Sequence, residues 1–164
     1  GVPRSLIQGW SEVAELADVP LRRVDWMLTA AQRALRQLTQ PWDGDLAWLV
    51  AEGQSMRLVL FRRWVPEVDH ALVDDDPLAR RREIRACVAS WQVRLATPSP
   101  LGWWFSVPTE QVDDFLPLVD GASDECCLNQ PLSSWAEPSD PDASVDVPSA
   151  LQQLALLALH LEER

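Results

Sequence analysis

The feature that most constrains the fold is a pair of apolar runs on either side of a short turn. The runs are Leu46–Ala51 and Met56–Trp64, and Glu52-Gly53-Gln54-Ser55 separates them. The second run alternates between apolar and other side chains over its first residues, as a strand with two different faces does. Two such runs around a glycine-containing turn predict a β-hairpin. Because short apolar runs are ambiguous, a helix over 45–65 stays open as the alternative.

Amphipathic helices are predicted before and after this hairpin. A helix over 5–17 has an apolar side made of Leu6, Trp10, Val13, Ala14 and Ala17. A helix over Leu21–Leu38 has a seam suited to packing on another helix, made of Leu21, Val24, Leu28, Ala31, Leu35 and Leu38. The last helix begins where Ser149 and Gln152 have the spacing of a capping box. We expect the first and last helices to pack together.

Further elements complete an α+β prediction. They are a helix over 78–89, a second hairpin from 91–96 and 103–107, and a short helix over 110–115. The expected fold is a small antiparallel sheet flanked by N- and C-terminal amphipathic helices, with an all-α bundle as the alternative. We expect three parts: a globular domain over 1–120 that begins with a helical pair, an acidic Pro/Ser/Asp-rich linker or loop over 121–148, and a C-terminal helix over 149–164 that packs back on the domain.

Charge is divided unevenly along the 164 residues. The net charge is -11, and residues 95–163 hold 12 acidic residues and no basic one. Such a surface repels nucleic acid and anionic membranes, which argues against both as partners. No apolar run approaches the roughly 20 residues that a membrane-spanning helix needs. We expect a protein partner, with a basic one favoured, and keep plain solubility as the alternative explanation of the charge.

Tryptophan is the unusual residue, with nine in the chain. Trp103, Trp104 and Phe105 follow a turn rich in proline and glycine. Aromatic rings of this kind line ligand pockets or anchor partners, so these three residues, with Trp48 and Trp64, are the candidates for ligand or partner binding. The alternative for the cluster is a plain core strand, because buried aromatic rings usually only pack.

No motif for catalysis is found. The chain lacks a glycine-rich phosphate loop, a Gly-x-Ser-x-Gly elbow and a His-Glu-x-x-His pair, so we expect no enzyme, no cofactor and no metal site. Cys87 stands alone, while Cys126 and Cys127 are adjacent. This spacing argues against a disulfide framework and favours a reducing compartment, hence the cytoplasm. The role of Cys126 and Cys127 stays open.

Two local patterns resemble known families. The helix over Leu21–Leu38 leads into Leu46–Gly53 and Met56–Leu60, and the chain closes with Leu151–Leu159; this order is similar to a GAF-type sensor domain, and it implies a sensor-like fold without transferring any ligand residue. The segment 11–38 resembles the C-terminal helix-turn-helix of bacterial sigma factors. That resemblance implies that Arg22 and Arg23 open a recognition helix and face DNA.

The sequence therefore predicts a non-catalytic regulatory or protein-interaction module of sensor-like type, with a homodimer through residues 21–38. One alternative is a helix-turn-helix transcriptional regulator. The other is an acidic inhibitor or assembly protein that binds a basic partner.

Overall fold

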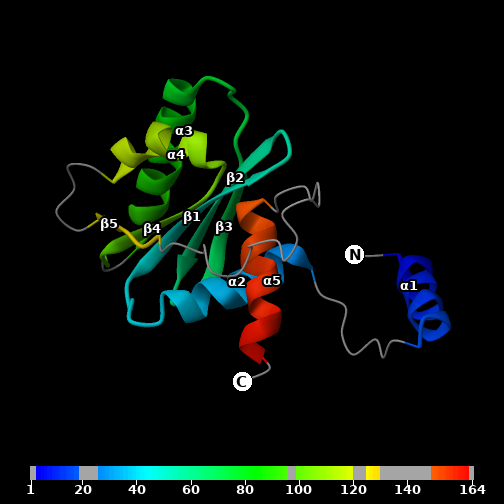
Figure 1. Ribbon diagram of the computed structural model, residues 1–164. Coiled ribbons are helices and arrows are strands. Elements are labelled where there is room, and N and C mark those ends of the chain that lie inside the picture. The colour runs from blue at the N-terminus through cyan, green and yellow to red at the C-terminus, as the bar shows by residue number, and fades with distance from the viewer. Residues whose placement is uncertain (1–2, 19–25, 96–98, 120–124, 130–148, 163–164) are drawn as a thin grey trace.

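The fold is a five-stranded sheet between two layers of helices. The computed structural model describes residues 3–18, 26–95, 99–119, 125–129 and 149–162. The elements are, in order, α1 (Arg4–Leu16), α2 (Met27–Leu38), β1 (Asp45–Glu52), β2 (Ser55–Arg62), β3 (Val65–Ala71), α3 (Pro77–Gln92), β4 (Leu101–Ser106), α4 (Thr109–Phe115), a 3-10 turn η1 (Leu116–Leu118), β5 (Glu125–Cys127) and α5 (Ala150–Glu162). In Figure 1, α2 and α5 cover one face of the sheet, α3 and α4 lie on the other, and α1 stands apart. The α+β class is confirmed.

The strand order is β3-β2-β1-β4-β5. β1 and β2 form the predicted hairpin, with Leu46 opposite Phe61 and Glu52 opposite Ser55. The helical alternative for 45–65 and the all-α bundle are therefore wrong. The sheet is mixed rather than purely antiparallel, because β4 runs parallel to β1 and β5 runs parallel to β4. β1 is thus a central strand, buried on both faces along its first six residues, which explains its nearly continuous apolar sequence.

The second predicted hairpin is wrong. Trp91 belongs to α3, and residues 103–107 belong mostly to β4, which pairs with β1 instead of with its own upstream neighbour. A parallel pair needs a crossover connection, and α3 provides it by carrying the chain from the β3 edge across one face of the sheet. The proline- and glycine-rich turn before Trp103 does lead into a strand, but it follows a crossover helix and does not connect two strands of a hairpin.

Two strands were not predicted. β3 is largely exposed and contains Pro66, so it lacks the apolar alternation that marks a strand; it lies at an edge of the sheet, where proline and charge are tolerated. β5 has only three residues and falls inside the stretch 121–148 that we expected to be a linker or loop. The remainder of that stretch from 130 to 148 lies outside the described residues, and the division of the chain at 120 stays a prediction.

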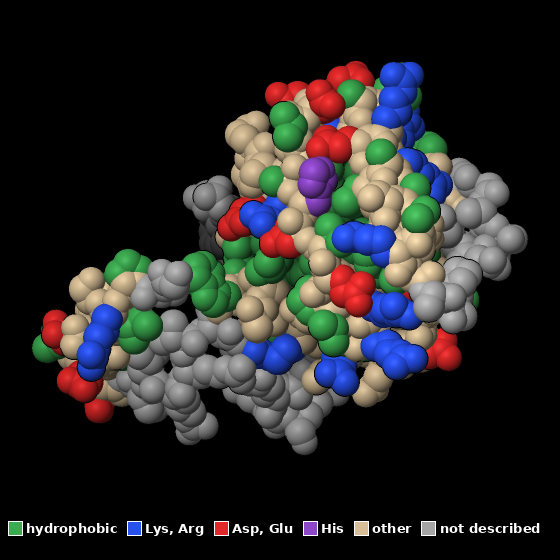
Figure 2. All heavy atoms as spheres, turned by 180° about the vertical axis from the view of Figure 1, so that it is seen from behind, with side chains coloured by type: hydrophobic (Ala, Val, Ile, Leu, Met, Phe, Trp, Pro, Cys, Tyr) green, Lys and Arg blue, Asp and Glu red, His purple; other side chains and the backbone are tan. Residues whose placement is uncertain are grey.

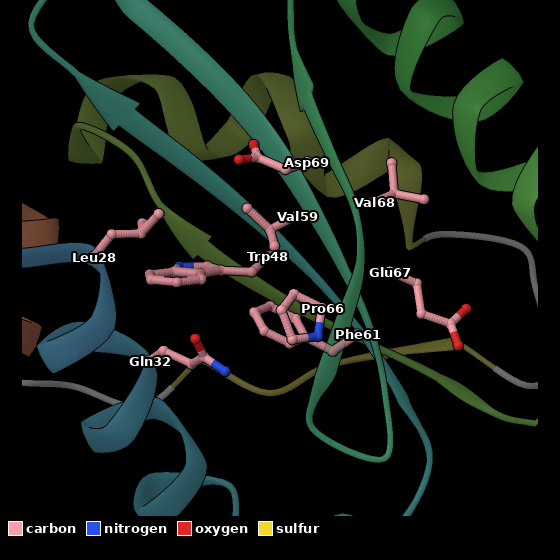
Figure 3. Close-up of a pocket in the computed structure, with 9 residues that line it drawn as sticks. All are labelled: Leu28, Gln32, Trp48, Val59, Phe61, Pro66, Glu67, Val68 and Asp69. Carbon is pink, nitrogen blue, oxygen red and sulfur yellow. The ribbon is translucent and has the colours of Figure 1, made fainter. Parts of the chain in front are cut away.

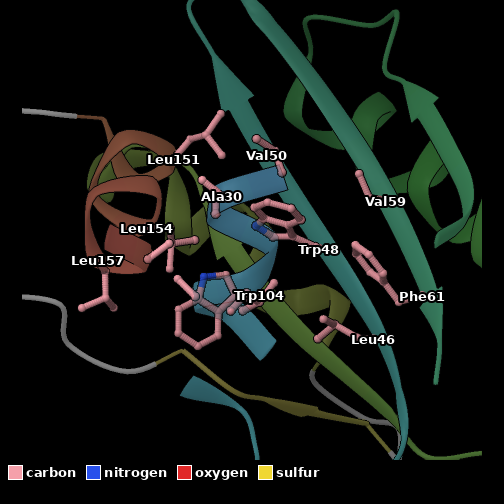
Figure 4. Close-up of a cluster of buried hydrophobic side chains, with 14 residues drawn as sticks. Ala30, Leu46, Trp48, Val50, Val59, Phe61, Trp104, Leu151, Leu154 and Leu157 are labelled. Atoms are coloured by element: carbon pink, nitrogen blue, oxygen red, sulfur yellow. The ribbon is translucent and has the colours of Figure 1, made fainter. Parts of the chain in front are cut away.

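The core consists of two clusters, one on each face of the sheet. Alternate residues of β1 point to opposite faces, so Trp48 joins the cluster under α2 and α5, while Leu49 joins the cluster under α3 and α4. Figure 4 shows the first cluster, in which the rings of Trp48, Trp104 and Phe61 lie over the sheet and the leucines of α5 face them. Because both faces of the sheet are apolar, each face must be covered by its own layer of helices.

The predicted apolar seam over 21–38 can be compared with the structure except at residues 19–25. The seam predicted over 21–38 is present in α2, and residues 19–25 lie outside the described part. Ala31 and Leu35 of that seam are fully buried, and α2 packs on α5. Leu28 and Leu38 of the same seam are half-buried, and a homodimer through residues 21–38 stays a prediction. Among the described residues, no helix is long and apolar enough to span a membrane.

The predicted capping box of α5 is formed. The Ser149 backbone N–H donates to Gln152 Oε1 at 2.8 Å, and the Gln152 backbone N–H donates back to Ser149 Oγ at 3.2 Å. The two bonds satisfy donors that the first turn of a helix otherwise leaves open. They fix the start of α5 next to the sheet, where its leucines enter the core.

Candidate functional site

The aromatic cluster of β4 lies inside the protein. Trp103, Trp104 and Phe105 are each at most 3% exposed. Trp104 faces α2 and α5, whereas Trp103 and Phe105 face the other layer, where the two rings stack with centroids 6.0 Å apart. Placed in this way they offer no surface to a ligand or partner, and the core-strand interpretation describes them. A central strand buried on both faces reads as a continuous apolar run, and that was the signal available in the sequence.

Trp48 and Trp64, the other two candidates, lie next to a cavity between α2 and the strands β2 and β3. We call it the Trp48 pocket; its volume is about 300 Å³ and it is lined by Leu28, Gln32, Trp48, Val59, Phe61, Pro66, Glu67, Val68 and Asp69. Figure 3 shows the rings of Trp48 and Phe61 side by side, with Leu28 and Gln32 approaching from α2. The Trp64 ring packs on Phe61 with centroids 6.2 Å apart. Trp48 is 0% exposed, so it is a core residue like the aromatic residues of β4 although it borders the pocket; Trp64 is half-buried and packs beside Phe61.

The polar groups of the Trp48 pocket are mainly hydrogen-bond acceptors. Asp69 accepts two bonds from Arg57 across β2 and β3, at 3.0 and 2.6 Å. Glu67 accepts from the Trp91 indole at 2.8 Å. The Gln32 amide makes a long contact of 3.5 Å with the Trp64 carbonyl oxygen. The Glu67 carboxylate thus bonds a residue of α3, which packs on the opposite face of the sheet, and the Asp69 carboxylate is paired with Arg57, so both acids of the lining already have partners. Sequence reasoning missed Glu67 and Asp69, because β3 itself was not predicted.

The turn beside this pocket is strained. Arg63 and Trp64 connect β2 to β3 with φ of +49° and +67°, a conformation that hairpin turns usually give to asparagine or glycine. For residues with a side chain each such angle costs about 1 to 3 kcal/mol, and such strain is concentrated at binding sites. The turn holds the Trp64 ring on Phe61, and the Arg63 side chain is exposed.

A second cavity lies where the parallel strands β1 and β4 end. This strand-end pocket has a volume of about 470 Å³ and is lined by Ala51, Gly53, Ser106, Val107, Pro108, Thr109, Glu110, Ser149, Ala150 and Gln153. From these ends the chain leaves β1 toward β2 and leaves β4 toward β5, in opposite directions along the sheet. Crevices at such a switch point commonly bind ligands in α/β sheets. Ser106 connects the cavity to the core, because its hydroxyl accepts a bond from the buried Trp48 indole at 2.9 Å.

The largest departure from the predicted packing is α1. None of its residues is buried. Leu6, Trp10 and Val13 lie on one side of the helix and are 54%, 60% and 55% exposed. In Figure 2, which shows the molecule from behind, α1 lies off the main body with hydrophobic side chains visible on it. The sequence predicted the apolar side of this helix correctly but did not indicate that this side would be exposed.

Burial raises the pKa of two thiols and one carboxyl among the described residues. Burial raises the pKa of the Cys126 thiol, with Cys127 beside it, and burial also raises the pKa of Cys87, so the thiolate is disfavoured at both. Burial raises the pKa of the Asp45 carboxyl against the opposing charge of Arg62. Within the described ranges, no group of three or more His, Cys, Asp or Glu side chains could hold a metal ion. Arg22 and Arg23, the candidate DNA contacts, lie outside the described residues.

No protein-family model, no curated protein and no solved structure matches this chain. The functional assignment therefore rests on the residues and their geometry.

Proposed function

We propose that this chain is a non-catalytic regulatory module that binds a protein partner through α1. The observation that carries the proposal is the exposed apolar side of α1. The residues Leu6, Trp10 and Val13 follow the spacing i, i+4, i+7. That spacing is typical of a helix that lays its apolar side into a groove of a partner.

Leaving these apolar side chains exposed to water forgoes favourable free energy of burial. Burying one large apolar side chain contributes roughly 1.5 to 3 kcal/mol. Leu6, Trp10 and Val13 are all at least half exposed, although the chain buries aromatic residues completely elsewhere. A single exposed leucine needs no explanation, but a continuous row on one helix marks an interaction surface.

The charges of α1 indicate the kind of groove. Glu12 and Glu15 lie on its polar side, and the whole chain has a net charge of -11. A groove with basic residues along its rim would complement both the helix and the field of the chain. This fits the basic partner that the charge pattern favours. We place the module in the cytoplasm as part of the same proposal, supported by three free cysteines.

Photo-crosslinking tests the proposal. A benzoylphenylalanine replaces Trp10 in the full chain, and the cells that contain it are irradiated. We expect one discrete covalent adduct, which disappears when Leu6 and Val13 are both changed to Ser. The matched control carries the same group at Gln8, on the polar side of the helix, and should give no adduct. If positions 8 and 10 give the same pattern, or neither gives an adduct, α1 does not bind a partner in this way.

A second candidate function is supported by the strand-end pocket, which would suit sensing of a small uncharged polar molecule. Ser106, Thr109 and Ser149 can each donate and accept hydrogen bonds there. The Trp48 indole N–H is bonded to Ser106, so its NMR resonance reports on this pocket. We would follow its chemical shift while ribose is titrated into the protein. A saturable shift that Thr109→Val abolishes would support sensing, and a resonance unaffected by ribose, glucose and adenosine would argue against it.

A further inference from the structure

We infer that the strand-end pocket binds a small neutral sugar through a vicinal diol, meaning two hydroxyl groups on adjacent carbon atoms. Ser106 would bond the ligand at the buried end of the pocket, and Glu110 would hold the diol at the exposed end. The inference rests on the second candidate function, for which it names the ligand class. It does not depend on the binding of a partner by α1.

The buried end of the pocket carries a hydroxyl group whose proton needs an acceptor. Ser106 is only 1% exposed, and its Oγ accepts a hydrogen bond from the Trp48 indole at 2.9 Å. An indole N–H can only donate, so this bond leaves the Ser106 proton unused. Among the described residues, the hydroxyl has no other hydrogen-bond partner. Buried donors are rarely left without an acceptor, so the Ser106 proton favours a ligand oxygen placed in the pocket.

Further hydroxyl groups lie nearer the opening. Thr109 and Ser149 both line the pocket and are exposed. Ser149 Oγ accepts from the Gln152 backbone N–H at 3.2 Å, so its proton can be donated to a ligand. Hydroxyl groups both donate and accept hydrogen bonds, as the hydroxyl groups of a sugar do. The lining therefore fits a ligand that offers donors and acceptors at several positions.

The charge of the lining disfavours ionic ligands of either sign. Glu110 is the one charged residue among the described lining residues, and the whole chain has a net charge of -11. A phosphate or a free carboxylate would meet no arginine in this lining and would be repelled. An ammonium ion would pair with Glu110, but it has no acceptor for the Ser106 proton. A neutral ligand that carries both donors and acceptors satisfies the two ends of the pocket at once.

Glu110 favours two adjacent hydroxyl groups over a single one. A carboxylate has two oxygen atoms that both accept, so it can take one proton from each hydroxyl of a diol. Acidic side chains bond a ribose hydroxyl in dinucleotide sites in a comparable way. The diol leaves the other oxygen atoms of the sugar free to accept from Ser106 and Thr109.

The size and the apolar part of the lining limit the ligand to a single sugar ring. The volume of about 470 Å³ is within the range of small-molecule sites. Ala51, Val107 and Ala150 provide apolar contacts for the carbon atoms of the ring. The described lining contains no aromatic side chain, so a nucleoside base would gain no stacking partner. We therefore expect a simple sugar to bind at least as well as a nucleoside.

Titration of the full chain with two methyl glycosides tests the inference, with the NMR shift of the Trp48 indole N–H as the readout. Methyl ribofuranoside carries a vicinal diol, whereas methyl deoxyribofuranoside keeps its other hydroxyl groups but has no vicinal diol. We expect a saturable shift with the first. The dissociation constant of the second should be at least about 10-fold higher, because it loses a hydrogen bond to a charged group.

A change at Glu110 and a matched control identify the residue that holds the diol. Glu110→Gln should raise the dissociation constant of methyl ribofuranoside at least about 10-fold, because an amide has one acceptor oxygen in place of two. Since Glu110 is exposed, the variant should fold like the wild type. Asp113→Asn removes the same charge from an exposed position of α4 outside the lining. This control should bind methyl ribofuranoside like the wild type.

Three results would overturn the inference: no saturable shift with methyl ribofuranoside, equal dissociation constants for the two glycosides, or a Glu110→Gln variant that binds like the wild type. If the two glycosides bind equally and Thr109→Val abolishes both shifts, the pocket senses neutral molecules without selecting a diol. In that case the second candidate function stands and the inference fails. Crosslinking at position 10 tests the α1 proposal separately, and its result does not depend on these titrations.

Discussion

The two N-terminal helices, α1 and α2, are both amphipathic, but only α2 buries its apolar side. Each has an apolar side with residues three and four positions apart. α2 buries that side completely at Ala31 and Leu35, against α5 and the sheet, whereas α1 buries no residue at all. The comparison teaches that helical periodicity identifies which side of a helix is apolar, but not which surface covers it. The position of α2 is determined by contacts within the chain, whereas the exposed apolar side of α1 is the basis of our proposal that α1 binds a partner.

The largest effect that tests this comparison is expected from leucine-to-alanine changes on the two helices. Leu35→Ala in α2 removes a fully buried side chain and should lower the free energy of unfolding by about 2 to 5 kcal/mol. Leu6→Ala in α1 should change it by less than about 0.5 kcal/mol, because Leu6 is 54% exposed. Urea denaturation at a protein concentration below association measures both. Equal losses would mean that α1 belongs to the cooperative core.

A smaller effect is expected from the buried hydrogen bond beneath α2. Ser106→Ala leaves the indole N–H of Trp48 without its acceptor in a buried place, which should cost about 1 to 3 kcal/mol. Ser55→Ala is the matched control, since its hydroxyl bonds to the Glu52 carbonyl oxygen at the surface. We expect the control to stay within about 0.5 kcal/mol of the wild type in the same denaturation experiment. If both serines behave alike, the region beneath α2 is less tightly packed than its burial implies.

A third helix, α3, contacts the sheet through a hydrogen bond between Glu83 and His70 of β3. Because this bond involves a titratable carboxylate, the stability that it contributes should depend on pH. Burial pushes the pKa of Glu83 upward, but hydrogen bonds from His70 and from the backbone N–H groups of Val73 and Asp74 outweigh it, and the pKa is lowered. The distance from His70 Nε2 to Glu83 Oε1 is 2.8 Å. A lowered pKa in the folded state gives stability that is present above the unfolded value of 4.5 and is lost as the pH falls through the folded pKa.

Comparison of wild type with Glu83→Gln from pH 3 to 7 measures this contribution. The wild type should be the more stable of the two above the unfolded value, and the two should converge as the pH falls below it. Glu15→Gln in α1 is the control on the exposed helix, and it should change the free energy of unfolding at pH 7 by less than about 0.5 kcal/mol. A difference between wild type and Glu83→Gln that stays constant down to pH 3 would contradict the assignment.

The parts of the fold that could be predicted are those in which local pattern and burial agree. The hairpin of β1 and β2 and the capping box at Ser149 follow from short-range chemistry. β3 could not be found, because an edge strand with Pro66 and charged neighbours resembles a loop. The pairing of β4 with β1 depends on a crossover of α3, and this long-range choice leaves no local pattern.

The candidate sites show the same limit. Trp48 was predicted from its aromatic character and borders a pocket although it is fully buried, whereas Trp103, Trp104 and Phe105 share that character and belong to the core alone. Composition cannot separate the two cases, since exposure depends on which helix covers each strand. Glu67 and Asp69 reach the Trp48 pocket only because β3 pairs with β2. Such convergence of distant residues is visible in three dimensions alone.

The smallest effect, and the most selective test of the comparison, is expected from a glycine within α1. Gly9 has open space around it, and replacing it with alanine should favour the helix by roughly 0.5 to 1 kcal/mol. We expect Gly9→Ala to raise the helical signal in circular dichroism while the midpoint of global unfolding stays the same, because α1 is not coupled to the core. Ala34→Gly makes the opposite change at a buried position of α2 and should lower the midpoint. If Gly9→Ala raises the global midpoint in a dilute, monomeric sample, α1 packs on its own domain, and the contrast between the two helices is wrong.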